Sequence, residues 1–229
     1  MKENASTPIY SITPFTLLDY AHKSACILWF AGCNMRCVYC YNPEIVLGKG
    51  TLSFEKTLEF LQSRKNLLDA VVFSGGECLL HKNIIELIKE VKKMGFLVKI
   101  DTNGSKPKVL KSLIENQLID YVALDFKALA KNFEKITKSI FFASFEKSLH
   151  LLLESKMQFE VRTTVHSDLI SKNDVSQMIV FLEQQNYCGN YYIQHFVNGV
   201  TTLEKLGHSF KELDSKTLST LQINVHFRG

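Results

Sequence analysis

Short apolar runs rich in β-branched residues alternate along the chain with segments whose apolar positions follow the helical period. The first pattern predicts strands and the second predicts amphipathic helices. The six predicted strands are Ala25–Phe30, Ala70–Ser74, Leu97–Asp101, Tyr121–Asp125, Phe159–Val165 and Tyr191–Phe196. The helices predicted between them are Phe54–Gln62, Asn83–Met94, Pro107–Asn116, Ser144–Ser155 and Asp174–Gln185. This alternation predicts parallel strands with crossover helices, and six repeats fit an incomplete (β/α)6 TIM-like barrel.

The signals for helix ends agree with these boundaries. Ser53 can cap the helix that opens at Phe54, and Pro107 can occupy the first turn of its helix. Gly95 can end the helix that runs to Met94.

No linker rich in Gly, Ser or Pro divides the 229 residues, and 46% of them are hydrophobic, enough to bury one core. We therefore expect one domain over residues 1–229, with a core at about 15–200 and a C-terminal extension at 201–229. Within this extension, Asp214–Gly229 can add one helix and a last strand at Ile223–Phe227.

Charge and hydropathy narrow the possible partners. The 27 basic and 23 acidic residues give a net charge of +4, and the lysines are scattered instead of forming a block, so nucleic acid is not indicated. The apolar run Ala25–Ala31 is far shorter than the ~20 residues of a membrane span. We expect a cytoplasmic protein without a membrane partner.

Cysteine spacing supplies the strongest chemical signal. Cys33, Cys37 and Cys40 form a C-x3-C-x2-C motif, and no fourth cysteine stands at ligand spacing. If three thiolates bind a cubane iron–sulfur cluster, one iron stays open to another ligand. Electron-carrier proteins usually bind such a cluster with four cysteine thiolates. A zinc site is the alternative, and it needs a further ligand; His22 and Cys26 lie upstream, but zinc sites normally come as two spaced pairs.

Polar residues also gather where the predicted strands end, and these ends share one face of a parallel barrel. The segments are Gly75-Gly76-Glu77, Asp101-Thr102-Asn103-Gly104 and Asp125-Phe126-Lys127. Paired glycines let the backbone approach a ligand, and a glutamate offers a carboxylate to a cationic amine. Each segment also has an ordinary interpretation: a Gly-Gly turn with a solvated glutamate, an Asn-Gly turn, and a strand end with a solvated lysine.

Two further residues are candidates for the same face. Arg162 lies in the middle of a predicted strand, where it is costly unless it meets an anion such as a cofactor carboxylate. An outward arginine paired with a helix carboxylate is the alternative. His195 stands at the end of the sixth predicted strand as a pocket residue, although a lone histidine there is more often a satisfied polar group.

The cysteine motif, with Tyr39 before its last cysteine, resembles the signature of the radical S-adenosylmethionine superfamily. This resemblance implies one [4Fe–4S] cluster held by the three cysteines and S-adenosylmethionine bound at its open iron, close to Tyr39. It also implies that Gly75, Gly76 and Glu77 form the element that contacts the methionine amino group. The cofactor then supplies the hard chemistry, and the protein supplies binding and orientation.

Within that superfamily, the order of motifs is similar to the glycyl-radical-enzyme activases, in particular the activating protein of anaerobic ribonucleotide reductase. The similarity implies that Asp101, Thr102 and Asp125 hold a monovalent cation beside the cofactor carboxylate. It places Lys127 near the substrate and gives Arg162 a cofactor contact. Two departures are Tyr41, where a histidine is common, and Ala21-His22, where a Pro-Gly turn is common.

The activase resemblance implies removal of a glycine hydrogen atom from a partner glycyl-radical enzyme by a 5′-deoxyadenosyl radical. The electron would come from a flavodoxin- or ferredoxin-type donor. Two alternatives stay open. One is a small-molecule radical enzyme such as a 7-carboxy-7-deazaguanine synthase, and the other is a zinc-stabilised binding protein without turnover.

Overall fold

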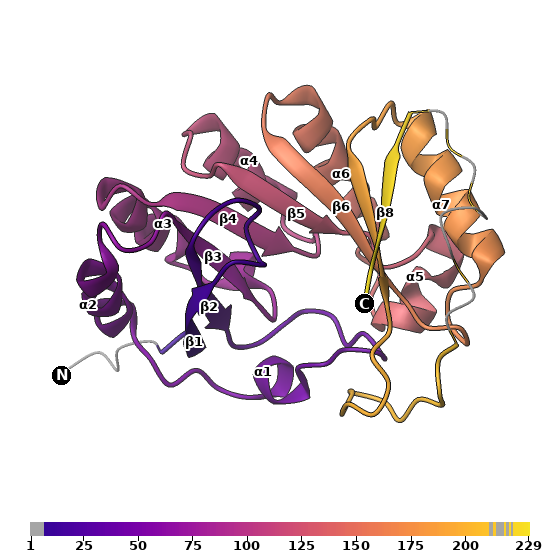
Figure 1. Cartoon of the computed structure of the whole chain (residues 1–229), viewed down its shortest axis with the longest axis horizontal. Coiled ribbons are helices and arrows are strands. Elements are labelled where there is room, and N and C mark those ends of the chain that lie inside the picture. Colours follow the sequence, from indigo (N-terminus) through magenta and orange to yellow (C-terminus); the bar gives the residue numbers. More distant parts are fainter. Residues whose placement is uncertain (1–6, 211–212, 214–217, 219, 221) are drawn as a thin grey trace. The chain divides into compact units, whose positions relative to one another are not determined.

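The computed structural model describes residues 7–210, 213, 218, 220 and 222–229. Its strands are ordered as in the chain, from β1 to β8 (Figure 1). The strands are β1 (Ile9–Thr16), β2 (Ala25–Phe30), β3 (Ala70–Gly75), β4 (Leu97–Thr102), β5 (Tyr121–Asp125), β6 (Gln158–Val165), β7 (Asn190–His195) and β8 (Asn224–Arg228). The helices are α1 (Pro43–Leu47), α2 (Phe54–Arg64), η1 (Cys78–Leu80), α3 (Ile84–Lys93), α4 (Pro107–Glu115), α5 (Ala130–Thr137), α6 (Phe142–Glu154) and α7 (Lys172–Gln184).

The chain forms two compact units. The first comprises residues 1–34, 42–102 and 108–122, and the second comprises residues 35–41, 103–107 and 123–229. The cysteine motif crosses from one to the other, because Cys33 belongs to the first unit while Cys37 and Cys40 belong to the second.

In the first unit, β2, β3 and β4 pair in parallel, and β1 pairs antiparallel with β2. Strand β3 is an apolar run, and its residues Ala70–Phe73 are buried throughout, as expected of a parallel strand covered on both faces. Helices α2 and α3 flank the strands of this unit (Figure 1). Ser53 caps α2 by accepting a hydrogen bond from the Lys56 amide at 3.3 Å.

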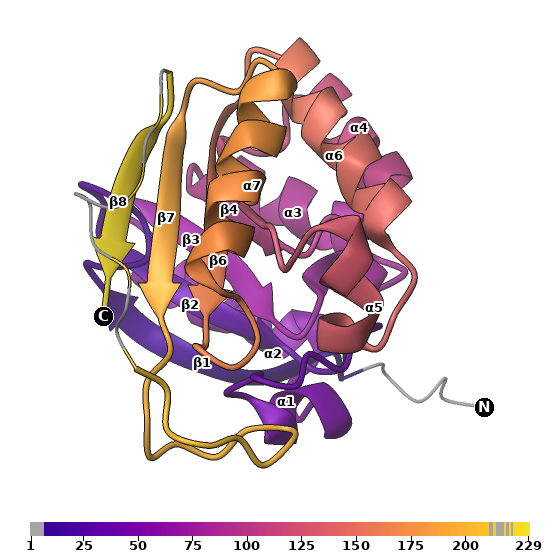
Figure 2. The ribbon, with the colours of Figure 1, turned by 90° about the vertical axis from the view of Figure 1, so that its right-hand side faces the viewer.

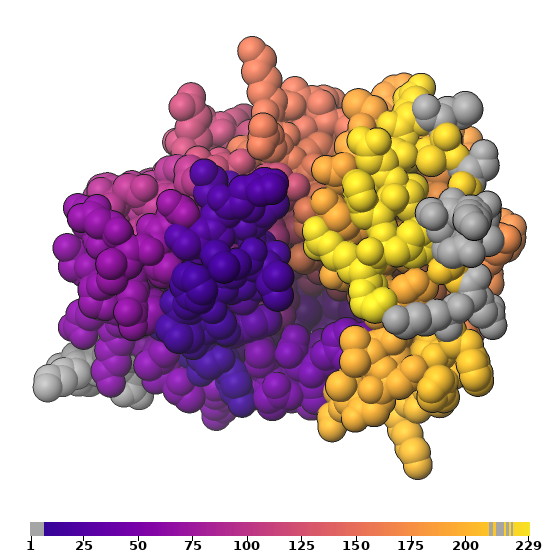
Figure 3. Space-filling model, viewed as in Figure 1, coloured from indigo at the N-terminus to yellow at the C-terminus, as the bar shows by residue number. Residues whose placement is uncertain are grey.

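In the second unit, β6, β7 and β8 pair in parallel. Helix α7 runs beside these strands (Figure 2) and opens with a capping box built by Ser171 and Asp174. Strand β8, yellow in Figure 3, lies at the surface, where its residues alternate between exposed and half-buried. Apolar residues of α7, among them Val175, Ile179 and Leu182, are buried.

The predicted strands and their parallel pairing are confirmed. All six predicted strands are present as β2 to β7, with ends shifted by at most a residue or two, and the expected last strand is β8. The predicted fold class, the incomplete (β/α)6 TIM-like barrel type with parallel strands, is confirmed. Pro107 opens α4, and Gly95 follows α3 with a φ of 94°. The helix expected within residues 214–229 lies largely outside the described residues.

Four elements, β1, α1, η1 and α5, were not predicted. Strand β1 contains Pro14, which argues against a strand in sequence. Ser11–Thr13 pair regularly with β2, and the register shifts between Thr13 and Thr16, where Pro14 lies. Helix α1 has five residues and the 3-10 helix η1 has three, too few for a periodic signal. Helix α5 lacks a side-chain cap at Leu129. Within the described residues, no helix is both long enough and apolar enough to cross a membrane.

Candidate active site

The cysteine motif lies in the loop that follows β2. At its start, in the first unit, Gly32 donates its amide to the Ile45 carbonyl at 2.8 Å and accepts a 2.9 Å hydrogen bond from the Glu77 amide. The Cys33 side chain that follows is half-buried. Backbone hydrogen bonds to two other segments therefore fix the entry to the motif.

Gly75 and Gly76 make this entry possible. Gly75 has a φ of 113°, and a Cβ on it would lie 2.4 Å from the Phe30 amide nitrogen. A Cβ on Gly76 would lie 1.9 Å from the Gly32 carbonyl oxygen and 3.3 Å from the Cys33 Cβ. The two glycines thus let the strand end approach the backbone of the cysteine loop.

The second half of the motif is fixed within the second unit. The Arg36 amide donates to the Thr137 carbonyl at 2.8 Å, and the Val38 amide donates to the Ile136 carbonyl at 2.9 Å. Helix α5 therefore uses its C-terminal carbonyls, which have no partner inside the helix, to hold the loop. Cys37 is 8% exposed, and Cys40 is half-buried.

Glu77 is fully buried, so the interpretation of a solvated glutamate is wrong. Its carboxylate accepts hydrogen bonds from the Thr102 hydroxyl at 2.9 and 3.0 Å and from the Leu79 amide at 3.1 Å. The predicted residues Glu77 and Thr102 are thus brought together. Thr102 is buried and orients the carboxylate.

Asp101 lies one residue before Thr102 and faces different partners. Its Oδ2 accepts a hydrogen bond from the Ser74 hydroxyl at 3.1 Å, and its Oδ1 lies 3.3 Å from the Lys99 Nζ. Asn103 and Gly104 form a turn, in which the Ser105 amide donates to the Asn103 side chain at 2.9 Å and Gly104 has a φ of 74°. The turn prediction for this segment is confirmed.

Asp125, Lys127 and Arg162 form an ion-pair cluster in the second unit. Asp125 Oδ1 accepts from Arg162 Nε at 3.1 Å and lies 3.0 Å from Nη2, while Oδ2 accepts from Lys127 Nζ at 3.1 Å. The side chains of Arg162 and Lys127 are 14% and 18% exposed. Lys127 is therefore not a solvated lysine, and the carboxylate that Arg162 meets comes from a strand, not a helix.

Burial and neighbouring charges shift the pKa values of Asp125 and Lys127 in opposite directions. Burial alone raises the pKa of Asp125, but the positive charges of Arg162 and Lys127 outweigh it and hold this pKa below its usual value. Burial lowers the pKa of Lys127, yet the negative charge of Asp125, followed by Tyr39 and Cys37, raises it well above the usual value. Lys127 is consequently a cation at neutral pH.

Tyr39 is buried beside this cluster. The Lys127 Nζ lies 6.0 Å from the centre of the Tyr39 ring, and burial raises the pKa of the phenol far above its usual value. The Tyr39 hydroxyl forms no hydrogen bond with another described residue. A buried polar atom of this kind is commonly satisfied by a bound ligand or water, which fits the predicted cofactor contact.

His195 ends β7 in the second unit. Its ring stacks on Phe227 with centroids 5.6 Å apart, and Gly229 lies beside the His195 backbone. A pocket role for His195 stays a prediction.

The donor set fits an iron–sulfur cluster. All six cysteines are thiols, none in a disulfide, and the three motif thiols sit on a loop fixed by backbone hydrogen bonds. In the part of the chain that the structure describes, no group of three His, Cys, Asp or Glu side chains is arranged to hold a single metal ion. Each thiolate of a cubane binds its own iron, so three thiols on one loop suit a cluster without converging on a single metal ion.

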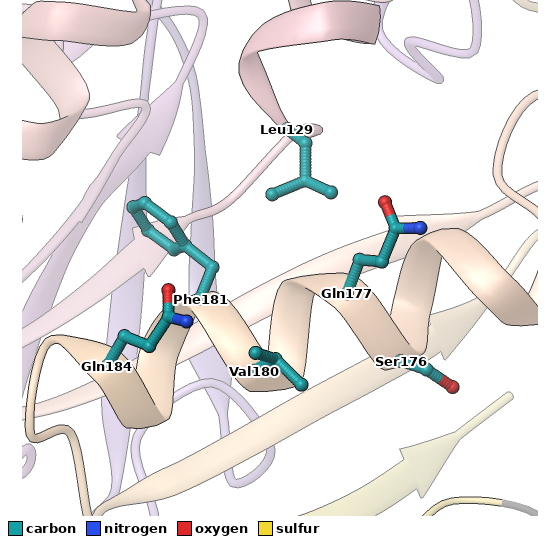
Figure 4. Close-up of a pocket in the computed structure, with 6 residues that line it drawn as sticks. All are labelled: Leu129, Ser176, Gln177, Val180, Phe181 and Gln184. Carbon is teal, nitrogen blue, oxygen red and sulfur yellow. The ribbon is translucent and has the colours of Figure 1, made fainter.

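A shallow apolar pocket of about 380 Å³ lies on α7. Leu129 faces the side of the helix that carries Gln177, Val180 and Phe181 (Figure 4). None of the site residues predicted from sequence lines it. The pocket on α7 is therefore separate from the residues predicted from sequence.

Sequence reasoning missed three contributors to the site. Lys99, 4% exposed, pairs with Asp101, and Ser74 binds the same carboxylate. Lys99 could have been recognised from sequence, because a lysine inside the apolar run of β4 is unusual. The third contributor is Tyr41, whose hydroxyl accepts a hydrogen bond from the Val197 amide at 2.9 Å. Its partner is too distant in sequence to be recognised from a pattern.

Comparison with known proteins gives independent evidence for the family to which the chain belongs. A family model described as "Radical SAM superfamily" matches residues 27–179. A protein of Methanocaldococcus jannaschii named "Putative glycyl-radical enzyme activating enzyme" is 32% identical, over 82% of this chain and 79% of its own length. The pyruvate formate-lyase-activating enzyme of Clostridium pasteurianum is 33% identical over 52% of each chain. The 7-carboxy-7-deazaguanine synthase of Halobacterium salinarum is 32% identical over 33% of this chain and 30% of its own.

Solved structures share the fold at low sequence identity. Streptococcus suis SuiB bound to S-adenosylmethionine matches 86% of this chain with a TM-score of 0.64 and 14% identity. Native anSMEcpe with bound AdoMet and a peptide matches 82% of this chain with a TM-score of 0.63 and 19% identity. The chain spans about half the length of these two structures, at 48% and 54%.

Proposed function

Because the chain belongs to the radical S-adenosylmethionine superfamily, we propose that it is a glycyl-radical-enzyme activase. Such an enzyme removes a hydrogen atom from a backbone glycine of a partner enzyme. The observation that carries the proposal is the similarity to the M. jannaschii protein, which extends over most of both chains. The Clostridium relative, named for the activation of pyruvate formate-lyase, supports the same class of partner.

Family membership implies a [4Fe–4S] cluster and S-adenosylmethionine, which together supply a 5′-deoxyadenosyl radical when bound. Cys33, Cys37 and Cys40 are the ligands that we assign to the cluster. The C-terminal end of α5 holds the loop that carries Cys37, and the Gly75-Gly76 turn holds the loop that carries Cys33.

The charged residues suit the two ends of an amino acid. Two cations, Arg162 and Lys127, face one carboxylate in the Asp125 cluster, an environment that favours an anionic group such as the methionine carboxylate. Glu77, oriented by Thr102, offers a carboxylate to the amino group. The buried Tyr39 hydroxyl is placed to accept or donate one further hydrogen bond.

The finer assignments are part of the same proposal. We assign anaerobic ribonucleotide reductase or a similar glycyl-radical enzyme as the partner, and a flavodoxin- or ferredoxin-type protein as the electron donor. A monovalent cation held by Asp101, Thr102 and Asp125 would be bound by oxygen atoms, the ligands that hard cations prefer.

Anaerobic reconstitution tests the proposal. The wild-type chain is expected to bind about four iron atoms and, once reduced, to form 5′-deoxyadenosine from S-adenosylmethionine. With the correct partner, electron paramagnetic resonance should detect a glycyl radical on that partner.

Two cysteine variants provide a matched pair. Cys37→Ala should lose the cluster and the 5′-deoxyadenosine, because it removes a thiolate ligand. Cys188→Ala should retain both, since Cys188 is exposed and lies outside the motif. Formation of 5′-deoxyadenosine without a glycyl radical on any candidate partner would refute the activase assignment.

The small-molecule alternative is supported by the shorter similarity to the 7-carboxy-7-deazaguanine synthase. A pterin-like substrate that raises the melting temperature and is consumed with 5′-deoxyadenosine formation would favour it. The superfamily match argues against a zinc-stabilised binding protein, and an iron-free, zinc-loaded protein after anaerobic purification would reverse that conclusion.

A further inference from the structure

The segment Phe196–Gly207, which leaves the end of β7 (Figure 2), contacts the end of the cysteine motif within the second unit. We refer to it as the clamp segment. Its first contact is with Tyr41: the Val197 amide donates to the Tyr41 hydroxyl at 2.9 Å, and the Phe196 and Tyr41 rings lie 5.3 Å apart. Tyr41 is the residue directly after Cys40, so this contact is adjacent to the last motif cysteine.

Two backbone hydrogen bonds continue the contact. The Leu203 amide donates to the Cys40 carbonyl at 3.2 Å, and the Glu204 amide donates to the Val38 carbonyl at 3.1 Å. The bonds connect the clamp segment to both sides of the turn that presents the Cys40 thiol.

The far end of the clamp segment is also held. The Gly207 carbonyl lies 3.1 Å from Nε2 of His166, which is fully buried. Glu204 forms a 3.1 Å ion pair with Lys138, but both side chains are about half exposed, so this pair contributes little. The backbone bonds, Tyr41 and His166 therefore determine where the segment lies.

The Tyr41 contact is the part that a single substitution can remove. Val197 and Val200 of the segment are largely exposed and bury little apolar surface, whereas Phe196 is buried against the Tyr41 and His166 rings, a contact that a phenylalanine at position 41 keeps. Losing one neutral hydrogen bond there is expected to raise the open population of the segment by about fivefold. Opening would expose the Cys40 carbonyl and thiol to water, and solvent exposure is one of the factors that set the reduction potential of an iron–sulfur cluster.

We propose that Tyr41 is a positioning residue that, through the clamp segment, fixes the Cys40 ligand loop and limits water at that ligand. This inference rests on the proposed function for the presence of a cluster, but not for the clamp itself. The clamp consists of contacts between residues of the chain alone.

The first experiment therefore uses the chain without iron and compares Tyr41→Phe with wild type. Tyr41→Phe keeps the ring and removes only the hydrogen-bond acceptor. Alkylation of Cys40 by N-ethylmaleimide and hydrogen exchange of the Val197, Leu203 and Glu204 amides should each accelerate about fivefold. Cys33 and the exposed Cys188 should react at the wild-type rate.

Tyr187→Phe is the matched control. The Tyr187 hydroxyl donates to the Asn190 carbonyl at 2.6 Å, so this variant also loses one hydrogen bond between a tyrosine and the backbone, at the start of β7. It should leave Cys40 alkylation unchanged. Equal acceleration at Cys33, Cys40 and Cys188 in Tyr41→Phe would show general loosening and overturn the proposal.

The second experiment measures the reconstituted cluster. In Tyr41→Phe, the midpoint potential should shift and the visible absorbance should decay faster under a chelator than in wild type and Tyr187→Phe. Unchanged alkylation, exchange and potential in Tyr41→Phe would refute the positioning role. If no variant, including wild type, binds a cluster, the proposed function fails, while the alkylation result still decides whether the clamp exists.

Discussion

Two carboxylates at strand ends are held in contrasting ways. In the first unit, neutral donors hold Glu77: the Thr102 hydroxyl and the Leu79 amide. In the second unit, Asp125 is held by two cations, Arg162 and Lys127. Both lie at carboxyl ends of parallel strands, where folds of this type place their chemistry.

The contrast shows that a strand-end carboxylate has no fixed role. Asp125 is a counter-ion that keeps two buried cations in place, so its removal changes the charge of the cluster. Glu77 is a buried acceptor whose orientation depends on hydrogen bonds. Three experiments test this difference between Asp125 and Glu77, in order of decreasing expected effect on stability.

Asp125→Asn should cause the largest loss of stability. It leaves Arg162 and Lys127 as two mostly buried cations without their counter-ion, which is expected to lower the free energy of unfolding by about 3 kcal/mol. Urea unfolding of the chain without iron measures the loss. Glu90→Gln, which breaks the exposed pair with Lys93, serves as the control and should have almost no effect. A loss no greater than that of the control would show that the cluster is not a structural ion pair.

Thr102→Val should have a smaller effect. It removes the hydroxyl that donates to the buried Glu77 carboxylate and keeps the side-chain shape, so we expect a loss of about 2 kcal/mol. Thr51→Val removes an exposed hydroxyl that donates to the Tyr10 carbonyl and should be nearly neutral. If the two valine variants unfold at the same urea concentration, Thr102 does not support Glu77.

The smallest effect is expected for the change in the Asp125 contribution to stability as the pH is lowered. The pKa of Asp125 is lowered in the folded chain, so its stabilisation is present above the unfolded value of about 3.9 and is lost as pH falls through the folded pKa. The stability gap between wild type and Asp125→Asn should stay constant from neutral pH down to about pH 5 and narrow below about pH 4. A gap that narrows already between pH 7 and 5 would contradict the lowered pKa.

Local sequence signals predicted the parallel strands well. Strands β2 and β3 are nearly continuous apolar runs, and the caps at Ser53 and Gly95 mark helix ends through interactions with near neighbours. Strand β1 was missed because Pro14 contradicts a strand locally, while pairing with β2 outweighs that preference.

The partners of the site residues could not be predicted in the same way. The motif identified Cys33, Cys37 and Cys40, because cluster ligation requires a short spacing. The pairing of Arg162 with Asp125 joins residues that lie 37 positions apart, and no pattern along the chain encodes such a distance. Residue types at strand ends were therefore predictable, but their hydrogen bonds were not.

The close contact between Gly76 and the Gly32 carbonyl has a consequence for cofactor assembly. Because no side chain fits at position 76, contacts between the chain's own backbone segments shape the loop before Cys33. A ligand loop that is ordered in advance loses less conformational entropy when its ligand arrives. At this end of the motif, the contacts of Gly32 with Ile45, Gly76 and Glu77 restrict the backbone and so reduce the entropy that cluster binding would cost.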